Sequence, residues 1–100
     1  MADLPIVIPK AELADFCRRH HIRRLAFFGS VLRNDFGPDS DIDVLVEFDP
    51  GHVPGLAFFE MELELSGLLG RKVDLNTLGF LSRYYREQVL AEAVVQYDAA

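Results

Sequence analysis

The stretch "FFGSVLRNDFGPDSDIDVLVEF", residues 27–48, decides the fold of this chain. It contains a Gly-Ser pair at 29–30, ten intervening residues, and then Asp41-Ile42-Asp43. From position 42 to position 48 every second side chain is apolar, so these side chains share one face of a strand and the two aspartates share the other. The stretch therefore predicts a turn, followed by a strand that carries two carboxylates on one face.

A later strand carries a third carboxylate on the face opposite its apolar side chains. The segment "RKVDLNT", residues 71–77, places Val73 and Leu75 on one face and Asp74 on the other. If this strand lies beside the one at 41–48, three carboxylates converge, and they repel one another unless they are neutralised. Mg²⁺ is usually held by one or two carboxylates plus substrate phosphates, and two such ions can clamp a phosphoryl displacement. The pattern predicts a site for metal and phosphate.

The Gly-Ser turn offers groups that suit the phosphate. Gly29 lets the backbone approach a phosphate closely, and a turn that opens a short helix presents free N–H groups. The Ser30 hydroxyl can donate to a phosphate oxygen, and Arg33 can add a bidentate contact. An ordinary solvated hairpin is the alternative, but this spacing arises by chance only about once per 1,000 chains of this length. We therefore favour a nucleotide site.

The remaining hydrophobic patterns complete a small domain. The expected elements are helices at 9–21, 56–70 and 80–97, strands at 22–29, 41–48 and 71–77, and a short helical turn within 30–36. This order predicts an α/β (α+β) fold, with a small mixed sheet covered by helices, in a single domain over 1–100 with an N-terminal arm at 1–9. The helix at 56–70 is apolar over more than one stripe. Contact with a partner is slightly favoured over full burial.

Composition and charge narrow the class of protein. The net charge of −6 argues against direct nucleic-acid binding, which needs a basic face. A nucleotide substrate stays open because metal ions reverse the local charge of an acidic pocket. The only cysteine, Cys17, excludes an intrachain disulfide and fits a reducing compartment. No signal peptide and no apolar stretch of about 20 residues is found, so we expect a cytoplasmic protein without membrane contact.

At this point the sequence resembles a known family. Gly29-Ser30, the ten-residue gap, Asp41-Ile42-Asp43 and the later Asp74 are similar to the signature of the DNA polymerase beta-like nucleotidyltransferase superfamily. The short length and the segments "GSVLR", "SDIDVLVEF" and "YYREQVLAEAVVQY" are most similar to the minimal nucleotidyltransferases. These are often antitoxins of two-gene modules whose other half is a helical HEPN ribonuclease. The resemblance covers residues 22–97.

The resemblance implies a polymerase beta-like fold and Mg²⁺-dependent transfer of AMP from ATP to a protein hydroxyl, typically a tyrosine of the paired HEPN toxin. By position, Asp41 and Asp43 would ligate two Mg²⁺ ions, and Asp74 would be the third carboxylate ligand and the general base. Gly29-Ser30 would hold the nucleotide phosphates, with Arg33 assisting.

Two other functions stay open at this stage. The chain could neutralise a partner by binding alone, or transfer a nucleotide to a small molecule such as an aminoglycoside. The absence of a second, substrate-binding domain counts against the small molecule and favours a hetero-oligomer with a toxin. The sequence leaves the base preference, the acceptor and the number of AMP units open.

Overall fold

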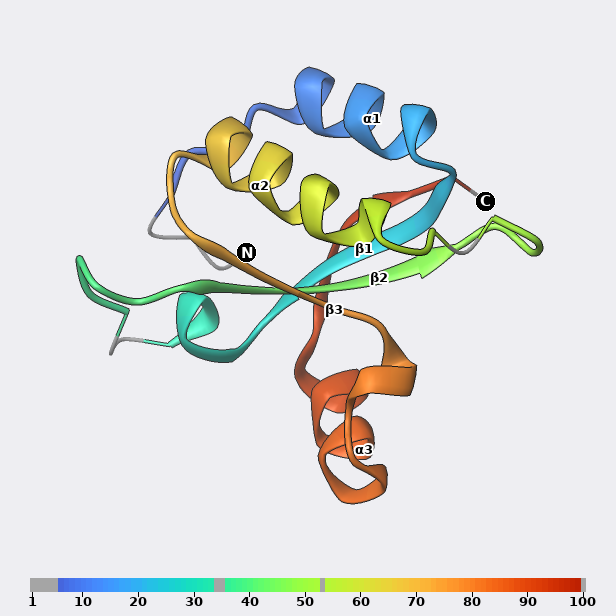
Figure 1. The fold of residues 1–100 in the computed structure, drawn as a ribbon. Helices are drawn as coiled ribbons and strands as arrows, with labels where there is room; N and C mark the ends of the chain where they lie inside the picture. The colour runs from blue at the N-terminus through green and yellow to red at the C-terminus, as the bar shows by residue number, and fades with distance from the viewer. Residues whose placement is uncertain (1–5, 34–35, 53, 100) are drawn as a thin grey trace.

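A four-stranded sheet with helices on both faces forms the architecture of the computed structural model, which describes residues 6–33, 36–52 and 54–99. The elements, in chain order, are α1 (Lys10–Arg19), β1 (Ile22–Phe28), the 3₁₀ turn η1 (Gly29–Leu32), β2 (Ile42–Phe48), α2 (Ala57–Leu69), β3 (Val73–Asn76), the 3₁₀ turn η2 (Leu78–Phe80), α3 (Arg83–Glu92) and β4 (Val94–Asp98). Helices α1 and α2 lie together on one side of the sheet, and α3 lies on the other side (Figure 1). The predicted α/β class is confirmed.

The sheet is mixed, and its strand order places the Asp-x-Asp strand in the interior. The order is β3-β2-β1-β4, with β2 antiparallel to β1 and parallel to β3. In this register Asp43 lies opposite Phe28 on one side and opposite Asp74 on the other. The two strands that carry carboxylates are therefore neighbours, which is the condition that the sequence analysis left open.

The end of the chain differs from the prediction of one helix over 80–97. Helix α3 starts later, after Ser82, whose side chain accepts a hydrogen bond from the Tyr85 N–H. It stops at Glu92, and the chain turns into β4, which pairs antiparallel with β1. The two adjacent valines at 94–95 explain the error, because β-branched side chains favour strands over helices. The missed strand brings the end of α3 to the Gly-Ser turn.

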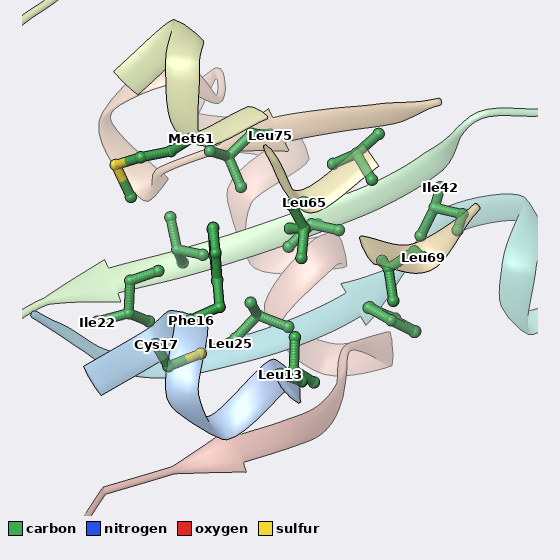
Figure 2. Packing of buried hydrophobic residues seen from close by; sticks show 14 of the residues in the cluster. Leu13, Phe16, Cys17, Ile22, Leu25, Ile42, Met61, Leu65, Leu69 and Leu75 are labelled. Atoms are coloured by element: carbon green, nitrogen blue, oxygen red, sulfur yellow. The ribbon is translucent and has the colours of Figure 1, made fainter. Parts of the chain in front are cut away.

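The main core lies between the sheet and the pair of helices α1 and α2 (Figure 2). Leu13, Phe16 and Cys17 face the sheet from α1, with the spacing of an amphipathic stripe. Burial raises the pKa of the Cys17 thiol to about 12. A thiol with so high a pKa is unreactive, so Cys17 acts as a core side chain.

A smaller cluster on the opposite face attaches α3. Phe28 from β1, Leu45 from β2 and Val89 from α3 are all buried there. The alternation of β2 places Leu45 on the same face as the two aspartates, and α3 covers it there. The cluster lies beside Asp43 in the strands, so it anchors α3 next to the carboxylates.

Helix α2 has two apolar faces, of which one is buried. Leu56, which precedes the helix, and Phe59 and Leu63 within it are 86%, 65% and 74% exposed. The opposite side of α2 packs into the main core. The wide apolar pattern is therefore divided between core and surface, and contact of the exposed stripe with a partner stays a prediction.

The N-terminal arm is described only from residue 6 onward, because residues 1–5 lie outside the described part of the chain. Ile6 and Ile8 are partly buried and pack against the main core. Across the described ranges, no helix has both the length and the apolar character that a membrane crossing requires.

Candidate active site

Three carboxylates meet at the start of β2 and β3. Asp43 and Asp74 are direct partners in the parallel register, and Asp41 immediately precedes β2. The N–H of Ile42 donates to the carbonyl of Lys72 at 2.9 Å, which fixes this register where the strands begin. Asp74 is exposed, and Asp43 is more buried. The predicted convergence of strands is present, with its carboxylates open to solvent on one side.

The electrostatics of Asp43 reflect this crowding. The pKa of Asp43 is raised to about 6, first by burial and then by the nearby carboxylates of Asp74 and Asp41, while the guanidinium of Arg33 opposes the shift. The site therefore carries negative charge that it does not neutralise by itself. A bound cation would relieve this repulsion.

The donor set fits Mg²⁺ better than a metal that needs a closed cage. Among the residues that the structure describes, no three His, Cys, Asp or Glu side chains form a preformed metal cluster. Mg²⁺ keeps several waters and is usually bound through one or two carboxylates plus substrate phosphates. Oxygen ligands from neighbouring strands, open to a phosphate, suit that ion. Metal binding by Asp41, Asp43 and Asp74 stays a prediction.

Gly29 joins the turn to the carboxylates. It has a φ of +77°, and a Cβ atom built on it would lie 2.2 Å from Oδ2 of Asp43. The turn then closes with a hydrogen bond of 2.9 Å from the Arg33 N–H to the Ser30 carbonyl. The Gly-Ser turn and the Asp-x-Asp strand, separated by ten residues in sequence, are therefore in direct contact. Ser30 and Arg33 keep some exposure beside this contact.

Glu92 is a fourth acidic residue at the site, and it was not among the residues predicted from the sequence. The N–H of Gly29 donates to Oε1 of Glu92 at 3.3 Å. Arg33 Nη2 donates to both carboxylate oxygens of Glu92, at 3.3 and 3.2 Å. Assigning residues 94–98 to a strand would have found it, because pairing of β4 with β1 brings the end of α3 to Gly29.

Arg71, also missed from the sequence, holds the loop between the turn and β2. Its Nη2 donates to the carbonyls of Gly37 and Ser40 at 2.5 and 2.8 Å. Its guanidinium lies over the ring of Phe36, 4.4 Å from the centroid. Because Ser40 directly precedes Asp41, this clamp positions the entry to the carboxylate strand.

Replacing Arg71 by lysine is expected to lower the free energy of unfolding by about 1–2 kcal/mol, because a lysine cannot reproduce two hydrogen bonds and a stacked plane. Thermal melting would measure the loss. Arg83→Lys, at an exposed position of α3, is the matched control and is expected to leave stability unchanged. Equal stability of the two variants would contradict the clamp.

The fold and the site define a nucleotidyltransferase. Residues 10–96 match the family model described as a nucleotidyltransferase domain, and the chain belongs to this family. The predicted resemblance is therefore confirmed at the level of the family and of the enzyme class.

Two similar proteins indicate the kind of nucleotidyltransferase that this chain resembles. The protein adenylyltransferase MntA of Thermococcus cleftensis is 39% identical over 86 residues, which are 85% of this chain and 82% of that protein. A solved structure described as a candidate minimal nucleotidyltransferase is 40% identical, with a TM-score of 0.71, over 85% of this chain and 86% of the other.

One further structure is similar in fold alone. It is the tri-AMPylated Shewanella oneidensis HEPN toxin in complex with its MNT antitoxin, which matches at 22% identity and a TM-score of 0.66 over 90% of this chain and 70% of the other. The chain is thus similar in fold to a protein solved together with a modified toxin.

Proposed function

We propose that this chain is a Mg²⁺-dependent protein adenylyltransferase that moves AMP from ATP to a tyrosine hydroxyl of a HEPN-type toxin and so acts as its antitoxin. One observation carries the proposal: the Gly29 turn touches Asp43, which lies in register beside Asp74. The similar proteins support it, since they include a protein adenylyltransferase and, by fold, an antitoxin solved with a tri-AMPylated toxin.

The residues of the site suit an in-line attack on the α-phosphate. The N–H of Gly29, the hydroxyl of Ser30 and the guanidinium of Arg33 are donors for the phosphate oxygens. Asp74, which is exposed whereas Asp41 and Asp43 are partly buried, would accept the proton of the incoming hydroxyl. The bond from the acceptor oxygen to the α-phosphorus forms as the bond to the β-phosphate oxygen breaks, and pyrophosphate leaves.

Asp41 and Asp43 would hold Mg²⁺, with Asp74 sharing a second ion. When bound, Mg²⁺ neutralises the charge that develops on the phosphate oxygens. The half-buried position of Asp43 against the Gly29 turn keeps its carboxylate close to the phosphate donors. Metal ligands and phosphate donors would thus face the same nucleotide.

The partner would supply the rest of the substrate surface. The described residues form a sheet with three helices, and the exposed stripe of Leu56, Phe59 and Leu63 offers apolar area for a hetero-oligomer in the cytoplasm. This arrangement favours a protein acceptor over a small molecule.

The test uses ATP labelled at the α-phosphate, Mg²⁺ and an extract of the source cell. Wild type and Asp43→Asn are incubated side by side, and a labelled protein band is expected with wild type alone. Identification of the labelled protein as a HEPN-type toxin carrying AMP on tyrosine would complete the assignment. A band of equal strength with Asp43→Asn, or label on a small molecule only, would overturn it.

A second candidate is an antitoxin that neutralises its toxin by binding without AMP transfer. The exposed stripe on α2 is the observation that favours it. Co-expression of the toxin separates the two, because the binding module predicts that Asp43→Asn still protects the cell. Protection that requires Asp43 favours the enzyme.

A further inference from the structure

Glu92 occupies the two donors that a nucleotide phosphate would need. Its carboxylate accepts from the N–H of Gly29 at 3.3 Å and from Arg33 Nη2 at 3.2 and 3.3 Å. An anionic oxygen held by a glycine N–H and an arginine reproduces the contacts of a phosphate oxygen. The side chain of Glu92 keeps 29% exposure, so it has a route into solvent.

These contacts and a bound phosphate exclude one another. The N–H of Gly29 is a single donor, and the guanidinium of Arg33 points at Glu92. A phosphate brought to the same donors would also lie against the Glu92 carboxylate. Like charges at hydrogen-bonding distance repel strongly where solvent is partly excluded.

The charge around the site adds to this conflict. The carboxylates of Asp74, Asp41 and Glu92 all act on Asp43 in the same sense, and Arg33 is the cation that opposes them. In the protein without nucleotide, the ion pair with Glu92 balances the positive charge of Arg33. Of these acidic groups, Glu92 is the one that lies at the end of a helix, whereas Asp74 lies on β3 and Asp41 directly precedes β2.

We propose that Glu92 is an internal competitor of the nucleotide: it holds Gly29 and Arg33 in place in the free protein and must leave them when a phosphate binds. The inference rests on the proposed function, because it takes the Gly29 turn as the phosphate site. It predicts that removing the charge of Glu92 strengthens nucleotide binding. A residue that merely supported Arg33 would have the opposite effect.

The experiment measures binding by titration calorimetry, with ATP and separately with inorganic tripolyphosphate as probes, in the absence of metal. Glu92→Gln keeps the shape of the side chain and removes its charge, and Glu92→Ala is a second variant should the first fold poorly. We expect both probes to bind about two- to tenfold more tightly, which is the range for release of a partly exposed, hydrogen-bonded ion pair. Glu87→Gln, exposed on the same helix, is the control for net charge.

A second readout follows the Gly29 amide by NMR. In wild type, added ATP is expected to shift this resonance because Glu92 leaves the Gly29 N–H. In Glu92→Ala, the resonance is expected to be shifted already without nucleotide. If Glu92 only positions Arg33, the variants should bind ATP as tightly as wild type or more weakly. That result would overturn the inference, and binding of ATP by wild type would still support the proposed function. An equal gain in Glu87→Gln also overturns it. Failure of wild type and variants alike to bind ATP without metal overturns the inference, and failure that persists when Mg²⁺ is added overturns the proposed function as well.

Discussion

Asp43→Asn is expected to abolish AMP transfer and, at the same time, to stabilise the nucleotide-free protein at pH 7.5. The loss of the carboxylate that we propose to hold Mg²⁺ should lower the rate of transfer by about 100-fold or more. The gain in stability follows from the pKa of Asp43, which the fold raises from 3.8 to about 6. Since the charged form is disfavoured in the folded state, the wild type loses stability as the pH rises from about 4 through about 6.

Asparagine carries no charge, so the variant escapes this loss. The full shift corresponds to about 3 kcal/mol, and partial exposure of the site reduces it to about 1–2 kcal/mol, or roughly 5 °C or more in Tm. Thermal melting from pH 4 to pH 8, without metal, tests the sign: the two curves should meet near pH 4, separate between about pH 4 and pH 6, and stay apart above that. Asp39→Asn, an exposed position in the preceding loop, is the charge-matched control. A variant less stable than wild type at pH 7.5 would contradict the electrostatic account.

Gly29→Ala is expected to be the most damaging single substitution in the turn, with a loss of about 2–5 kcal/mol and of nucleotide binding. Two costs add. A residue with a Cβ at a φ of +77° costs about 1–2 kcal/mol, and a new atom 2.2 Å from Oδ2 of Asp43 must displace that carboxylate. Gly70→Ala measures the cost of the backbone angle alone, because Gly70 has a φ of +71° and nothing lies within 4 Å of the added atom.

A double-mutant cycle can measure separately the cost of the contact between the added methyl group and Asp43. In the Asp43→Ala background the nearest remaining atom, Cβ of residue 43, lies 3.4 Å from the new methyl group, which is ordinary contact. The cost of Gly29→Ala should therefore be smaller in that background by about 1–3 kcal/mol. Chemical denaturation of the four proteins measures the coupling. Additive effects would show that Gly29 is required for its backbone angle alone.

Much of the site followed from the alternation of side chains along two strands. The apolar residues of β2 and β3 fix which face enters the core, and the aspartates follow on the other face because the strand period is two. The resemblance to a nucleotidyltransferase rested on those same aspartates and on the Gly-Ser pair. The structure adds that Asp43 and Asp74 are direct neighbours and that the turn touches Asp43.

What escaped prediction depends on tertiary contacts. A valine pair next to a helix is ambiguous by itself, and only an open edge on β1 decides that it forms β4. Glu92 and Arg71 have no local signal, because their roles arise from the Gly29 turn 63 residues away and from a loop more than 30 residues away. The burial of Leu45 likewise depends on α3, which packs over it from another part of the chain.

The pairing of the first and last strands also sets the order in which the protein can be built. Strand β1 leaves the ribosome early, but its partner β4 and the Glu92 contact with Gly29 involve residues near position 95. Contacts between residues so far apart in sequence form late and slow the folding of small domains. While it is being synthesised, the nascent chain can pair β1 with β2 and β2 with β3, but its Gly29 and Arg33 remain open to any anion until α3 is made.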